Sequence, residues 1–133
     1  MSMKVLIADP DWRFAEHATS YLESRAHLVV HETQAERALK QATHWKPDLV
    51  IAAAELAGNG LLEALGRLQP RPAVLLTDWM DRFDRVWRAW QHGGDELLMK
   101  PVFNVEELHA SIVTAMENAA VGTRRRERLA ASA

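Results

Sequence analysis

Residues able to bind a cation or a phosphoryl group occur at or just after the ends of short apolar runs. They are Asp9, Asp11, Glu55, Thr77, Asp78 and Lys100. Carboxylates, a hydroxyl and an ammonium are the groups that hold magnesium and a phosphate together in proteins. These residues form one site only if the apolar runs are neighbouring strands that end at the same edge of a sheet. The secondary structure therefore has to be predicted first.

The apolar runs are short and are bounded by turn residues, which is typical of buried parallel strands. Strands are predicted over 3–8, 28–30, 49–53, 73–77 and 97–99. Segments with helical spacing of apolar residues lie between them, over 12–24, 33–44, 61–68, 81–92 and after residue 104. This alternation predicts an α/β fold, a flavodoxin-like (βα)5 sandwich of three layers, α/β/α. Its parallel five-stranded sheet has the order 2-1-3-4-5, and ligands bind at the carboxyl ends of the strands.

Several residues mark where the helices begin and end. Thr33, followed three residues later by Glu36, is typical of a capping box at the start of the second helix. Asn104 is expected to cap the last helix. Gly93 and Gly94 suit the end of the fourth. These signals support the predicted element boundaries.

Composition excludes several classes of protein. The 133 residues are 48% hydrophobic and 26% charged, which suits one globular domain. The absence of cysteine excludes disulfides, thiolate zinc sites and a cysteine nucleophile. A net charge of -2 gives no basic field for binding nucleic acid or a membrane surface. The apolar runs are too short for a membrane span or a secretory signal, so a cytoplasmic protein is expected.

Four segments, taken in order, carry a family resemblance. They are Val5–Asp11, Pro47–Ala53, Val74–Thr77 and Gly93–Pro101. Together they resemble the receiver domain of bacterial response regulators, over about residues 3–119. The resemblance implies the flavodoxin-like fold and a place in two-component or phosphorelay signalling. We therefore expect a receiver-like domain over 1–121 and a basic tail, either a helix extension or a linker, over 122–133.

Two positions depart from the family pattern where its chemistry takes place. The resemblance places Ala53 at the position of the phosphoaccepting aspartate, and Pro10 at the second residue of the acidic pair. Aspartyl phosphorylation needs a carboxylate nucleophile and a bound cation. Alanine supplies neither, and Asp9 with a displaced Asp11 is a poor octahedral magnesium site. We expect no aspartyl phosphotransfer, no catalysis and no magnesium or other cofactor.

The remaining positions form a degenerate version of the family's phosphorylation cleft. Of the phosphoryl-sensing groups Thr77 and Lys100 remain, and Lys100 is expected to form an ion pair with Asp9, because an unpaired buried charge is costly. Glu55, two residues past Ala53, is an alternative acceptor or a built-in phosphate mimic. The resemblance also implies a cis peptide between Lys100 and the proline that follows.

Aromatic residues give the fourth helix a wider apolar arc than a helix over a sheet needs. The resemblance places family core residues at Val86 and Ala89, which leaves part of the arc exposed for a partner. In receivers the fourth helix, fifth strand and fifth helix form the usual output and dimer surface. The predicted interaction surface therefore consists of Phe83, Trp87, Trp90 and Leu97, the last at the family's aromatic switch position.

These observations favour an atypical receiver, a pseudo-receiver that acts through contact with a protein partner or as a homodimer. The alternative is a receiver-fold module that senses a small ligand in the strand-end cleft, made less polar by Ala53. An enzyme of flavodoxin-like fold is disfavoured, because no glycine-rich phosphate loop follows the first strand. The six histidines lack ligand spacing on one helix face, so no metal site is predicted.

Overall fold

The alternating strands and helices lie in the order predicted. The computed structural model describes residues 2–132, with side-chain surroundings through residue 122. The elements are β1 (Lys4–Ala8), α1 (Trp12–Ser24), β2 (Leu28–Glu32), α2 (Ala35–Trp45), β3 (Leu49–Ala53), η1 (Ala54–Asn59), α3 (Leu61–Gly66), β4 (Ala73–Trp79), η2 (Met80–Arg82), α4 (Phe83–Trp90), β5 (Glu96–Lys100) and α5 (Val105–Ser132).

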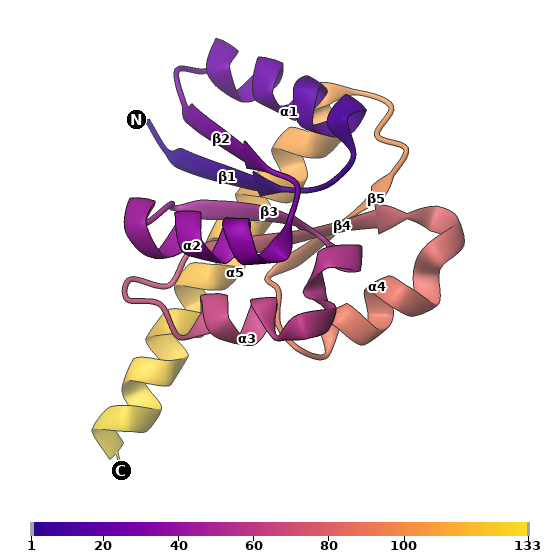
Figure 1. The fold of residues 1–133 in the computed structure, drawn as a ribbon. Helices are drawn as coiled ribbons and strands as arrows, with labels where there is room; N and C mark the ends of the chain where they lie inside the picture. The colour runs from indigo at the N-terminus through magenta and orange to yellow at the C-terminus, as the bar shows by residue number, and fades with distance from the viewer. Residues whose placement is uncertain (1, 133) are drawn as a thin grey trace.

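The five strands form one parallel sheet with the order β2-β1-β3-β4-β5, which confirms the predicted topology. Helices α2, α3 and α4 cover one face of the sheet, and α1 and α5 cover the other (Figure 1). Because both faces are covered, the central strand β3 is buried along its whole length. A continuous apolar run, without polar alternation, is the sequence pattern that such a strand requires.

Alternate residues of each strand supply two separate cores. In β3, Val50 and Ala52 face the core under α2, α3 and α4, whereas Leu49 and Ile51 face the core under α1 and α5. The period of two follows from the strand pleat. The strands end together at the same edge, so the residues that follow β1, β3, β4 and β5 are brought close to one another.

Of the two predicted N-caps, Asn104 is confirmed and Thr33 is wrong. Asn104 Oδ1 accepts a hydrogen bond from the Glu107 amide at 3.0 Å. At the start of α1, the Asp11 carboxylate accepts hydrogen bonds from two amides of the first turn. The predicted cap at Thr33 fails, because β2 runs to Glu32 and α2 begins only at Ala35. Gln34, in extended conformation, is the N-cap residue and makes no side-chain capping bond.

The region between β4 and α4 also differs from the prediction. Strand β4 continues two residues past Thr77 and pairs with the end of β5, so that Trp79 lies opposite Lys100. A short 3-10 turn, η2, follows, and α4 starts only at Phe83. The Lys100–Pro101 peptide is cis, as the resemblance implied. Within residues 2–132, no helix combines the length and the apolar character needed to cross a membrane.

Candidate functional site

The strand ends bring Asp9, Thr77 and Lys100 into direct contact. Lys100 Nζ lies 2.8 Å from Asp9 Oδ2, and the Thr77 hydroxyl donates to the same oxygen at 3.5 Å. Asp9 and Thr77 are fully buried, and Lys100 is 3% exposed. The other Asp9 oxygen accepts the Asp11 amide at 2.8 Å. The predicted ion pair of Lys100 with Asp9 is therefore confirmed, and both Asp9 oxygens are engaged.

The Asp11 carboxylate makes two kinds of interaction at this site. One oxygen accepts the amides of Arg13 and Phe14 as the cap of α1, and the other lies 3.2 Å from Lys100 Nζ. Partial burial acts to raise the pKa of Asp11, but the Phe14 amide and the Lys100 ammonium outweigh it, so the pKa lies below its ordinary value. Although one place late for the family pattern, Asp11 thus supplies the second negative charge next to Lys100.

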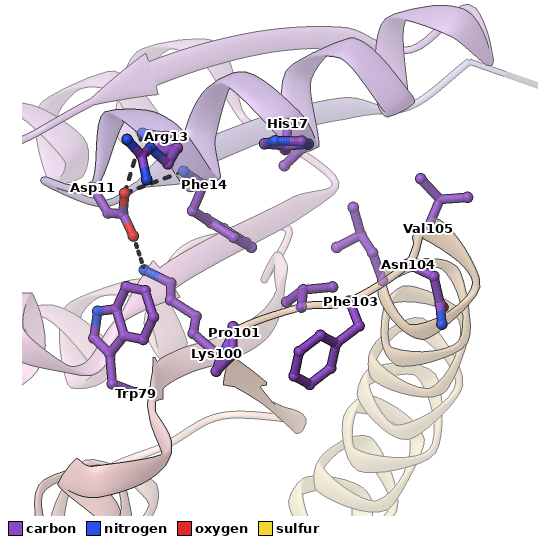
Figure 2. Close-up of a pocket in the computed structure, with 13 residues that line it drawn as sticks. Asp11, Arg13, Phe14, His17, Trp79, Lys100, Pro101, Phe103, Asn104 and Val105 are labelled. Atoms are coloured by element: carbon purple, nitrogen blue, oxygen red, sulfur yellow. Dashed lines mark hydrogen bonds and ion pairs between the residues drawn. The ribbon is translucent and has the colours of Figure 1, made fainter.

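Aromatic rings cover the ammonium group from two other elements. Lys100 Nζ lies 4.7 Å from the centre of the Phe14 ring and 5.5 Å from that of Trp79. Both are cation–π distances. Figure 2 shows Phe14 pointing down from α1 and Trp79 flanking Lys100. Sequence reasoning missed this cover, because Trp79 reaches Lys100 only through the unpredicted extension of β4.

Ala53 ends β3 beside Thr77, to which it is paired in the sheet register. Its methyl group is 3% exposed. A methyl group can neither attack a phosphoryl group nor bind a cation. The position at which the resemblance expects the acceptor therefore holds a buried side chain with no such chemistry.

A second buried carboxylate, that of Asp78, lies near the same edge. The sequence placed it at the end of the fourth strand without assigning it a partner or a role. Asp78 is 3% exposed and accepts two hydrogen bonds from Arg85 of α4, at 2.7 and 2.5 Å. The Asp78 carboxylate raises the pKa of Arg85, and the charge of Glu55 acts in the same direction. The sequence signal was available: a charged residue that follows an apolar strand without a break needs a buried partner.

Glu55 is placed away from Lys100. It is exposed and lines a hollow of about 570 Å³ between the start of α2 and η1. Among the described residues, the carboxylates that contact Lys100 are those of Asp9 and Asp11. Glu55 thus makes no contact that would let it act as a phosphate mimic toward Lys100. Its electrostatic partner is Arg85.

The structure divides the four residues of the predicted interaction surface into two pairs. Phe83 is 63% and Trp87 51% exposed, one helical turn apart on α4. Trp90 and Leu97 are half-buried and contact the core beneath α4. Val86 and Ala89, expected to be core residues, are buried.

Several histidines make contacts within the fold. His31 Nε2 lies 2.7 Å from the Asp9 carbonyl oxygen, and His27 Nδ1 accepts the Met3 amide at 2.9 Å. Through residue 122, no group of three histidine, aspartate or glutamate side chains has the arrangement of a metal site. The predicted absence of magnesium remains a prediction.

Comparison with known proteins supports the resemblance to response-regulator receivers. No family model matches the chain. It is 28% identical over 116 residues to the alkaline phosphatase synthesis transcriptional regulatory protein PhoP of Bacillus subtilis, a match that covers 84% of this chain and 48% of PhoP. The chain thus spans about half the length of this curated relative.

Solved structures give the same fold. NtrX from Brucella abortus superposes with a TM-score of 0.80 at 20% identity, covering 96% of this chain and 29% of NtrX. The chemotaxis response regulator CheY4 of Vibrio cholerae gives 0.75 at 18% identity, with coverage of 86% and 99%. A protein described as one of a family of streptococcal redox sensors, evolved from two-component response regulators, gives 0.74 at 18%, with coverage of 92% and 54%. The fold is that of response-regulator receiver domains.

Proposed function

We propose that this chain is an atypical receiver, a pseudo-receiver that works in the cytoplasm by contacting proteins in two-component or phosphorelay signalling. It carries no phosphoryl group at Ala53, catalyses no reaction and uses no magnesium. The observation that carries the proposal is the buried methyl group of Ala53, at the end of β3 where the resemblance places the phosphoacceptor.

The surroundings of Ala53 support the same function. Lys100, the cation that remains near this position, is neutralised by two carboxylates and covered by two rings. Separating this buried ammonium from its two carboxylate partners would leave unpaired charge in an apolar interior, which is costly. A phosphoryl group would have to compete with two carboxylates, those of Asp9 and Asp11, for the charge of Lys100.

A receiver that is not phosphorylated needs a different signal to regulate it. The streptococcal neighbour is described as a redox sensor that evolved from response regulators, so a receiver fold has elsewhere been put to a different signal. In this chain we infer that the input is the binding of a partner. Aspartyl phosphate has no part in it.

The surface for that partner is the α4 side of the molecule. Phe83 and Trp87 expose large apolar side chains there, while Trp90 and Leu97 anchor the same side to the core. Exposed aromatic residues on a rigid element are typical of the energetically dominant residues of interfaces. We propose that a second copy of the chain, or a related receiver, covers Phe83 and Trp87.

Labelling with a small phosphodonor tests the phosphorylation part of the proposal. The chain is incubated with radiolabelled acetyl phosphate and magnesium, and acid-stable label is counted per molecule. Ala53→Asp is the matched variant, because it places a carboxylate at the predicted acceptor position with the rest of the site unchanged. We expect no label above background on the native chain.

The variant shows what else the site has lost. Label on Ala53→Asp but not on the native chain would mean that the acceptor alone is missing. Absence of label from both would show that Pro10 and the engaged Lys100 also prevent the reaction. Stoichiometric label on the native chain, mapped to one aspartate or glutamate by mass spectrometry, would overturn the proposal.

A further inference from the structure

A groove opens beside Lys100, between α1 and the segment that joins β5 to α5. Its volume is about 700 Å³, within the range of about 300 to 1,000 Å³ of small-molecule sites. Figure 2 shows Phe14, Trp79 and Phe103 arranged around this space. Ala53 does not line it. The groove therefore differs from the strand-end cleft that the small-ligand alternative expected at Ala53, and it lies on the α1 side of Lys100.

The lining is mainly apolar and partly exposed to solvent. Phe103 is 76% exposed, and Val105, at the start of α5, is 52% exposed. Phe14, Val102 and Leu108 continue the apolar surface inward. An exposed phenylalanine beside a concave apolar wall gains free energy when a ligand covers it, because apolar area leaves water.

The polar groups of the lining favour an anion. Arg13 and His17 lie one turn apart on α1, and within the described residues neither side chain makes a hydrogen bond or ion pair. Lys100 Nζ has three protons and two carboxylate partners. The carboxylate in the lining, that of Asp11, already accepts from two amides and from Lys100. The unpaired side chains are therefore basic.

We propose that this groove binds a small amphipathic organic anion, with its acidic group at Arg13 and His17 and its flat or aliphatic body on Phe14 and Phe103. The groove's volume suits a small molecule, and its apolar wall disfavours a simple inorganic anion. The inference does not depend on the proposed function, because binding here neither requires nor prevents labelling at Ala53.

The position of Trp79 links binding in the groove to α4. Trp79 lines the groove and is followed directly by η2 and α4. An occupant that contacts the indole therefore contacts the segment that leads to Phe83 on the exposed side of α4. The groove is placed to alter the partner surface without any change at Ala53.

A fluorescent amphipathic anion, 8-anilinonaphthalene-1-sulfonate, is the probe. Its emission is titrated with the native chain and with Arg13→Gln and Phe103→Ala, both at exposed positions. Trp87→Ala is the matched control, since it removes an exposed aromatic side chain from the other apolar surface. Bound probe is then displaced with octanoate or with octylammonium, which differ in the sign of the charge.

We expect saturable binding that weakens about tenfold in Arg13→Gln, the effect of losing one charge-assisted hydrogen bond. Phe103→Ala is expected to weaken it about fivefold through lost apolar contact. Trp87→Ala should bind like the native chain, and octanoate alone should displace the probe. Three outcomes would overturn the proposal: no saturable emission, loss of binding in Trp87→Ala but not in the groove variants, or equal displacement by octylammonium.

Discussion

Two regions of the molecule differ in the exposure of their side chains. The strand-end cluster consists of Asp9, Asp11, Thr77 and Lys100. The aromatic face of α4 consists of Phe83 and Trp87. In the cluster, charged groups that prefer water are buried, or partly buried in the case of Asp11, and are bonded to one another. On α4, aromatic groups that prefer the interior are exposed. Each arrangement departs from the usual distribution of residues, and each calls for a reason.

The reasons differ. In the strand-end cluster, the ammonium and the carboxylates pair with one another. Few of their hydrogen-bonding groups therefore remain for a ligand at Ala53. On the aromatic face of α4, two large aromatic side chains are more than half exposed among the residues whose surroundings are described. The comparison shows that the charged side chains at the strand ends are satisfied within the fold, whereas the aromatic side chains of α4 are still available for contact.

The largest expected effect is that of Lys100→Met, which keeps the length of the side chain and removes its charge. The Asp9 carboxylate is fully buried, so it would lose its counter-ion without gaining water. The free energy of unfolding in urea should fall by about 3–5 kcal/mol. The double variant Asp9→Asn, Lys100→Met should recover much of the loss, and a loss below about 1 kcal/mol in the single variant would contradict this pairing of buried charges.

Arg85→Gln extends the test to the second buried carboxylate. Asp78 would lose a partner that donates two hydrogen bonds, and the free energy of unfolding should fall by about 2 kcal/mol. The Arg85 side chain is 30% exposed, which makes the effect smaller than that of Lys100. Arg88→Gln is the matched control on α4. Its ion pair with Asp84 is exposed, so a change of at most about 0.5 kcal/mol is expected, and equal losses would refute the distinction.

Asp11→Asn examines the electrostatic part of the cluster through pH, since asparagine keeps the helix cap. The folded pKa of Asp11 lies below its ordinary 3.8. Its ionised form therefore stabilises the fold above that value, and the stabilisation is lost as pH falls through the folded pKa. The native chain should exceed the variant by about 1 kcal/mol near pH 7. The difference should shrink in acid, and a difference that grows there would contradict the assignment.

Trp87→Ala has the smallest expected effect on stability and tests whether the aromatic face of α4 is a dimer interface. An exposed residue contributes within about 0.5 kcal/mol to folding. Light scattering over a concentration series should show a dimer of the native chain and a monomer of the variant. Trp90→Ala is the control that should instead destabilise the fold, because Trp90 contacts the core. A dimer that persists in Trp87→Ala would place the contact elsewhere.

Much of the architecture could be predicted from the sequence. Continuous apolar runs such as Leu49–Ala53 require strands buried on both faces, and their alternation with helical spacing leaves few topologies. The Lys100–Asp9 ion pair followed from the cost of an isolated buried charge. The resemblance placed the acceptor position at Ala53, and the residue type there and its place at the end of an apolar run are both visible in the sequence.

Only the tertiary structure determined which side chains cover the site and which are exposed to solvent. The pairing of Trp79 with Lys100 depends on the register of β4 and β5, which local sequence does not encode. The same holds for the Asp78–Arg85 pair, for the direction of Glu55 and for the groove beside Phe14. Residue types and short-range periodicity set the elements, because these are local properties. Exposure and partnership depend on segments far apart in the chain, and they are settled only when those segments meet.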